Sequence, residues 1–150
     1  MTLKSKFNLL TIVVLLFTTI SFAQKSKGQP SIIEGDVAIN KYHDRDDLER
    51  MGKGQLLSLY NSRIEVIIKI LPNIAFATKP GVTMNSLGIP DTKENRSALQ
   101  QNKDATTTYF SNTVEFQKIV LPYSDKSDLI SAILFYEETL KSLHNYDDFN

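Results

Sequence analysis

The apolar residues of this chain recur at the three- and four-residue spacings that are typical of amphipathic helices. Two seams stand out, one within residues 57–71 and one within residues 129–143. The first consists of Leu57, Tyr60, Ile64, Ile67 and Leu71, and the second of Leu129, Ile133, Tyr136, Leu140 and Leu143. Each seam predicts a helix that buries one face. Further apolar residues beside the first seam widen the apolar face of its helix. This helix is therefore expected to be the central one of the fold.

Turn residues and helix-start signals divide the sequence into three long helices. The first is expected over residues 46–71, with residue 53 as an alternative start because Gly52 and Gly54 weaken the helix there. The second runs over about 92–121 and the third over about 125–145. A proline follows each of the first two, and proline cannot continue a helix. The pattern predicts an all-α fold, an antiparallel bundle of three long helices. It leaves open a short fourth helix from 44–52 or 83–88.

The second helix differs from the other two in its polarity. Asp91 and Glu94 fit a capping box at its start. Its first half, residues 93–108, is polar, and a strong apolar face is expected only beyond it. The connection before this helix, residues 73–91, carries several apolar side chains and is expected to lie against the bundle, because unpacked loops of this length are uncommon.

The N-terminal segment has the layout of a secretory signal. Lys4 and Lys6 precede an apolar run over residues 9–17, and Ser21 and Ala23 are small residues two apart. We expect cleavage after Ala23, with a retained membrane anchor as the alternative. The sequence around this site resembles the signals of Gram-negative envelope proteins, which implies a periplasmic or secreted protein. The expected remainder is an extended polar leader over 24–43, a helical domain over 44–146 and an acidic tail over 147–150.

Composition narrows the function classes. The chain has 150 residues, no cysteine and no tryptophan, and its 17 basic residues balance 17 acidic ones. Loss of Lys4 and Lys6 with the signal would leave an excess of two acids. A net charge this close to zero gives no long-range electrostatic attraction to nucleic acid or to an anionic membrane. After signal cleavage, no stable membrane span is expected. Without disulfides, stability must come from packing.

The most specific cofactor hypothesis is haem. Met51 near the start of the first helix and His144 near the end of the last are placed as in four-helix b-type cytochromes, and the resemblance covers only these two residues and the architecture. It implies that they would be the axial ligands. Methionine is also common core filler, and a terminal histidine can favour a helix C-terminus through its charge.

Other site chemistry has weaker support in the sequence. No Glu-x-x-His pair exists for a di-metal site, so Glu65, Glu115 and the pair Glu137–Glu138 are interpreted as polar helix faces. The acidic run 44–49 lacks the glycine and terminal glutamate of a calcium loop and is interpreted as helix-start charge. We therefore expect no catalytic residues, no metal site and no bound cofactor.

The leading functional hypothesis is a non-enzymatic protein-interaction module of the periplasm or extracellular space, such as an adaptor, an inhibitor or a toxin-neutralising partner. Its partner would be another envelope or extracellular protein, contacted through residues 73–91 or 93–108. A bundle that binds haem or another small ligand is the alternative, and an enzyme is the third hypothesis.

Overall fold

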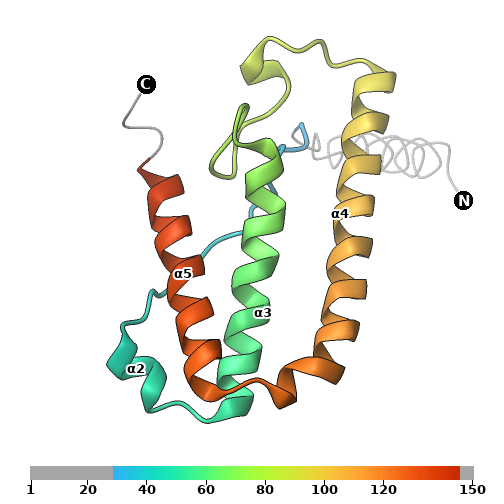
Figure 1. Ribbon diagram of the computed structural model, residues 1–150. Helices are drawn as coiled ribbons and strands as arrows, with labels where there is room; N and C mark the ends of the chain where they lie inside the picture. The colour runs from blue at the N-terminus through green and yellow to red at the C-terminus, as the bar shows by residue number, and fades with distance from the viewer. Residues whose placement is uncertain (1–28, 146–150) are drawn as a thin grey trace, which may run out of the picture.

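The computed structural model describes residues 29–145, and the regular structure within them is helical (Figure 1). The predicted all-α class is confirmed. The expected signal peptide, residues 24–28 of the expected leader and the expected acidic tail lie outside the described residues. Residues 29–145 form four helices: α2 (Arg45–Glu49), α3 (Lys53–Ile70), α4 (Lys93–Val120) and α5 (Lys126–His144). Three single 3-10 turns join them: η1 (Leu71–Asn73), η2 (Asn85–Leu87) and η3 (Leu121–Tyr123).

The first long helix begins at Lys53, the alternative start, and the segment before it forms the separate short helix α2. Asp44 caps α2, because its carboxylate accepts a hydrogen bond from the Asp47 backbone N–H at 2.7 Å. The Gln55 side chain accepts from the Gly52 backbone N–H at 2.9 Å at the start of α3. Local capping bonds therefore define both helix starts.

The cap of α4 differs from the one predicted. Thr92, one residue after the expected cap, accepts a hydrogen bond from the Asn95 backbone N–H at 3.1 Å. The Asp91 carboxylate instead accepts from the Gln29 side chain at 3.0 Å and lies 3.3 Å from the Arg96 guanidinium. The predicted capping box at Asp91 is therefore wrong, because Gln29 and Arg96 engage this side chain instead.

The core lies between α3 and α5, which run in the same direction. Two clusters of buried residues follow this helix pair, one at each end. The cluster near the helix starts contains Leu48, Leu56, Leu129, Ile130 and Ile133. The cluster near the helix ends contains Ile33, Val37, Val66, Ile70, Ala77, Leu140 and Leu143. The leader thus contributes two of its side chains to the core.

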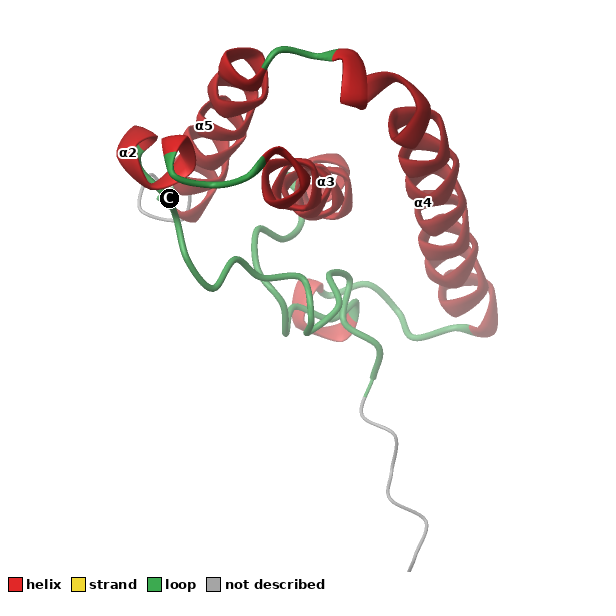
Figure 2. Ribbon diagram, turned by 90° about the horizontal axis from the view of Figure 1, so that it is seen from below, coloured by secondary structure: helices red, strands yellow, loops and turns green. Residues whose placement is uncertain are grey.

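Helix α4 runs opposite to α3 and α5 but buries none of its side chains. In Figure 2, α5 and α4 lie on either side of α3, and the leader and the 73–91 connection lie below it. The predicted antiparallel bundle of three long helices is therefore not confirmed. The described residues form a well-packed α3–α5 pair with α4 beside α3.

The 73–91 connection lies against the core, as its apolar residues predicted: Ala77 is buried in the core cluster, and Ile74 and Val82 pack against it. It also bonds to the leader. The Ile32 backbone N–H donates to the Val82 carbonyl at 2.8 Å. The Ser31 hydroxyl donates to the same carbonyl at 3.1 Å and accepts from the Gly81 N–H at 2.9 Å. Turn η2 ends at Gly88, whose φ of +73° is readily adopted by glycine. No helix among residues 29–145 has both the length and the apolar character needed to cross a membrane.

Candidate functional site

Two charged residues are buried in the core, between the two apolar clusters. Arg63 on α3 is 5% exposed and Glu137 on α5 is 1% exposed. Glu137 was interpreted from the sequence as part of a polar helix face, and that interpretation is wrong. Its position in the buried stripe is the signal that sequence reasoning missed: Glu137 lies four residues after Ile133 and three before Leu140.

A dense set of hydrogen bonds connects these two charges to the leader. Arg63 Nε and Nη2 donate to Glu137 Oε1 at 2.9 and 2.6 Å. The other carboxylate oxygen accepts from the His43 backbone N–H at 2.6 Å, and the His43 ring Nδ1 lies 3.1 Å from Oε1. Arg63 Nη2 also donates to the Lys41 carbonyl at 2.7 Å. The cluster therefore ties α3, α5 and the leader together.

The environment of Glu137 favours its ionised form. Burial alone would raise the pKa of this carboxyl, but the hydrogen bonds from His43 and the bonds and charge of Arg63 outweigh it. The result is a pKa below the ordinary 4.5. Because the folded-state pKa is depressed, the ionised carboxylate stabilises the fold above the unfolded-state pKa, and this stabilisation disappears as the pH falls through the folded-state value.

We expect a loss of stability in acid that depends on Glu137. The free energy of unfolding from urea titration should fall as the pH drops below about 4.5, the ordinary value for this group. Glu137→Gln should show a smaller loss over the same window, because it has no carboxylate to protonate there. Glu138→Gln, at the exposed neighbouring position, is the matched control and should keep the full dependence. Equal slopes in all three proteins would contradict this assignment.

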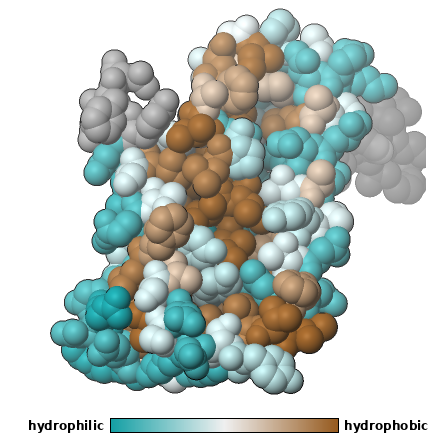
Figure 3. All heavy atoms as spheres, viewed as in Figure 1, coloured by the Kyte–Doolittle hydropathy of each residue, from teal (hydrophilic) through white to brown (hydrophobic). Residues whose placement is uncertain are grey.

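The second feature is a half-buried apolar stripe on α3. The buried residues of this helix are Leu56, Arg63, Val66 and Ile70. The seam predicted from the sequence to be packed lies beside this buried stripe, roughly a quarter turn around the helix. Its members Leu57, Tyr60, Ile64 and Ile67 are half-buried, and Leu71 is 38% exposed. Figure 3 shows apolar residues along the middle of this face, over α3 between α5 and α4.

We call this feature the trough, with the five seam residues as its floor and α5 and α4 as its walls. At its upper end in Figure 1, a groove of about 370 Å³ opens between α3 and α4. The groove is lined by Ile67, Ile68, Leu71, Pro72, Ala105, Thr106 and Tyr109. The trough is therefore apolar on its floor and on the α4 side.

The α4 wall carries large apolar side chains that remain exposed. Tyr109 is 60% exposed and Phe116 is 63% exposed. Phe116 and Val120 lie 7 and 11 residues after Tyr109, close to whole numbers of helical turns, so all three share the groove side of α4. Ile119 and Tyr123 follow on the adjacent side, 70% and 88% exposed. We call these five residues the α4 stripe.

The α5 wall meets the floor through a tyrosine pair. The rings of Tyr60 and Tyr136 have centroids 5.5 Å apart, and their hydroxyl oxygens lie 3.5 Å from each other. Burial first, and then the hydrogen bond with Tyr60, raises the pKa of Tyr136 to about 12. Both causes favour the neutral phenol, so this wall carries no charge from Tyr136 at neutral pH.

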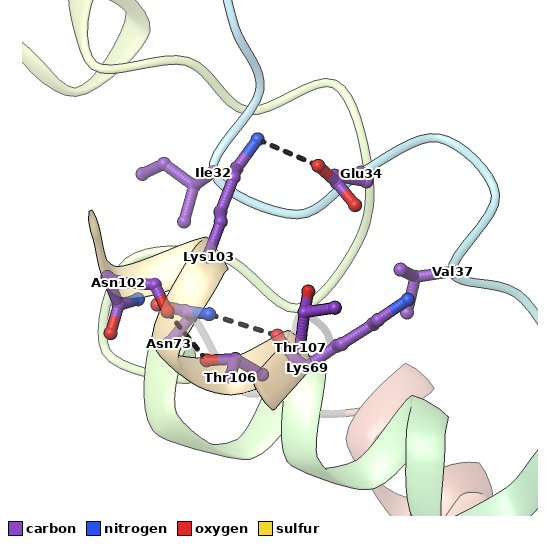
Figure 4. Close-up of a pocket in the computed structure, with 9 residues that line it drawn as sticks. All are labelled: Ile32, Glu34, Val37, Lys69, Asn73, Asn102, Lys103, Thr106 and Thr107. Atoms are coloured by element: carbon purple, nitrogen blue, oxygen red, sulfur yellow. Dashed lines mark hydrogen bonds and ion pairs between the residues drawn. The ribbon is translucent and has the colours of Figure 1, made fainter. Parts of the chain in front are cut away.

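On the opposite side of α3, a small polar cleft lies between the leader, α3 and α4 (Figure 4). Lys103 lies 3.5 Å from Glu34 across this cleft, and the Asn73 amide donates to the Lys69 carbonyl at 2.9 Å. The free volume is about 30 Å³. This is room for one or two water molecules, not for an organic cofactor.

The structure does not bring the two haem candidates together. Met51 packs in the cluster near the start of α5, and His144 is the last residue of α5. A helix of 19 residues is about 28 Å long. Met51 and His144 are therefore at opposite ends of the α3–α5 pair, and the two could not ligate one iron in this arrangement.

The remaining acidic candidates have local partners. Glu65 pairs with Lys69 at 2.8 Å, and Glu115 lies 3.9 Å from Lys118 on the surface of α4. In the acidic run 44–49, Asp47 pairs with Lys41 at 3.3 Å. No group of three or more histidine, aspartate or glutamate side chains within residues 29–145 is placed to hold a metal ion.

The two surfaces expected to bind a partner differ in the structure. The 73–91 connection packs on the leader, although Phe76 and Leu87 remain exposed, whereas the 93–108 half of α4 is polar and mostly exposed. The trough, which the sequence did not identify as a surface, carries the larger set of apolar side chains. Comparison with protein-family models, with curated proteins and with solved structures finds no match to this chain.

Proposed function

We propose that this protein is a non-enzymatic interaction module that binds an apolar helix of a protein partner in the trough. The observation that carries the proposal is the seam on α3, which has the spacing of a packing face but is only half-buried between α5 and α4. Apolar surface of this extent on a soluble domain commonly marks an interaction site.

The shape of the trough fits a helical ligand. The floor runs from Leu57 to Leu71, which spans about 21 Å along the helix axis. A helix of similar length lying along it would contact α3 and both walls. Helix-in-groove recognition uses anchor residues at three- and four-residue spacings, and the floor has the same spacing.

The buried charges fit a structural role in this proposal. Arg63 and Glu137 neutralise each other, and their hydrogen bonds hold the leader across the α3–α5 pair. This holds the leader on the side of α3 away from the trough. With the signal expected from its N-terminal sequence, we place the module in the periplasm or outside the cell, where it would act as an adaptor, an inhibitor or a toxin-neutralising partner.

Site-specific photo-cross-linking in the native organism tests the proposal. A photoreactive amino acid at Leu71, on the floor, or at Phe116, on the α4 stripe, should give a protein adduct. The same probe at Ser97 or Gln101, on the polar half of α4, should give none. Adducts at all four positions in equal yield, or at none of them, would contradict a specific trough interaction.

A further inference from the structure

We infer that the partner in the trough is a second copy of this chain, paired about a two-fold axis so that the α4 stripe of each copy packs over the trough of the other. This inference rests on the proposed function and specifies its partner. It depends on three properties of this face: self-complementary shape, absence of charge at its centre and exposed apolar area.

Self-complementary shape is the first property. A two-fold interface uses the same patch on both subunits, so the patch must contain both a ridge and a recess that receives it. Here the recess is the trough floor, with Ile67 and Leu71 in its groove. The ridge is the α4 stripe beside it. Tyr109 belongs to both, because it lines the groove and is still 60% exposed.

Absence of charge is the second property. Neither the five floor residues nor the five residues of the α4 stripe include a lysine, arginine, aspartate or glutamate. Two identical charged patches would repel each other, whereas two uncharged apolar patches do not. Interfaces between identical subunits are more apolar than the general surface and have few charges at their centre. A charged ligand would have no complementary charge among these ten residues.

Area is the third property. Tyr109, Phe116 and Tyr123 are each more than half exposed, and a fully buried aromatic side chain covers about 150–250 Å². These three rings alone would bury roughly 300 Å² per copy. Ile119, Val120 and the floor add to this, toward the roughly 800 Å² per partner that a stable complex buries.

The test uses the absence of cysteine from the chain. Phe116→Cys and Ile119→Cys, made separately, place one thiol near the middle of the α4 stripe. In the inferred dimer, α4 of one copy lies next to α4 of the other, so mild oxidation should give a covalent dimer of at least one variant. Lys118→Cys, on the same turn but outside the stripe, is the matched control and should form no covalent dimer.

Sedimentation of the unmodified protein supplies the second readout. It should show a concentration-dependent mass of two copies, and Phe116→Glu should weaken this association by at least about 30-fold, as expected for an interface anchor. Phe116 is 63% exposed in the single copy, so the urea unfolding midpoint of Phe116→Glu should match that of the unmodified protein at concentrations where both are monomeric. Lys118→Ala should associate like the unmodified protein.

The outcomes separate the two proposals. A monomer at all concentrations, with trough cross-links to a different protein, overturns the second-copy inference and leaves the interaction module standing. A monomer with no cross-link from the trough overturns both. A dimer that Phe116→Glu does not weaken, or disulfides that form as readily at Lys118→Cys, would place the contact elsewhere and also overturn the inference.

Discussion

Glu137→Ala should lower the free energy of unfolding by about 3–5 kcal/mol, the range for breaking a buried ion pair by removing one partner. The cost arises mainly from Arg63, which is 5% exposed and would remain charged in the core without its counter-charge. The His43 backbone N–H would lose its acceptor at the same time. Urea unfolding at pH 7 measures the change.

Two further variants test whether the loss of stability is specific to this buried ion pair. Glu138→Ala, one residue along on the exposed side, should change the free energy of unfolding by less than about 1 kcal/mol, because exposed ion pairs contribute little. The double variant Arg63→Met with Glu137→Leu removes both charges and should recover most of the loss, since apolar replacements of buried pairs are often neutral. A single variant as stable as the unmodified protein would show that the pair is not buried in solution.

Two adjacent leucines should differ sharply in their cost of replacement. Leu56→Ala should destabilise the fold by about 2–5 kcal/mol, because Leu56 is fully buried and its loss leaves a cavity. Leu57→Ala should cost about 1 kcal/mol, because Leu57 belongs to the half-buried trough floor. Urea unfolding of the two variants at one protein concentration gives the comparison.

Concentration dependence refines the leucine comparison. If two copies pair through the trough, Leu57→Ala also weakens the dimer, so its measured cost should grow as the protein concentration rises. The cost of Leu56→Ala should stay large at every concentration. If Leu57→Ala were the more damaging substitution in the monomer, α3 would be rotated relative to the arrangement described here.

The elements of the fold could be predicted because their signals are local. Three- and four-residue apolar spacing located the long helices, and Pro72 and Pro122 marked their ends to within a residue or two. Gly52 separated α2 from α3. Each of these signals acts on the backbone within about one helical turn, so contacts with distant residues change the helix boundaries little.

The packing could not be predicted in the same way. Helix α3 carries two adjacent apolar stripes, the trough floor and the buried stripe. The residue spacing alone does not tell which of the two is buried. The leader and α5 decide which stripe is buried, and both are far from α3 in the sequence. Similarly, the buried role of Glu137 depends on Arg63, 74 residues away. In the sequence, a single glutamate between apolar residues does not show which distant residue carries its counter-charge.

The hydrogen bond between His43 and Glu137 joins residues that are 94 positions apart. The ribosome makes the leader before α3 and α3 before α5, so this contact can form only after residues 43–137 have been made. Until then, Arg63 has no carboxylate to neutralise it, and neither apolar cluster has its α5 side chains. Contacts between distant residues also slow folding. This fold can therefore be completed only after α5 has been synthesised, and a chain that stops before Glu137 would retain both the leader and α3 without the helix that joins them.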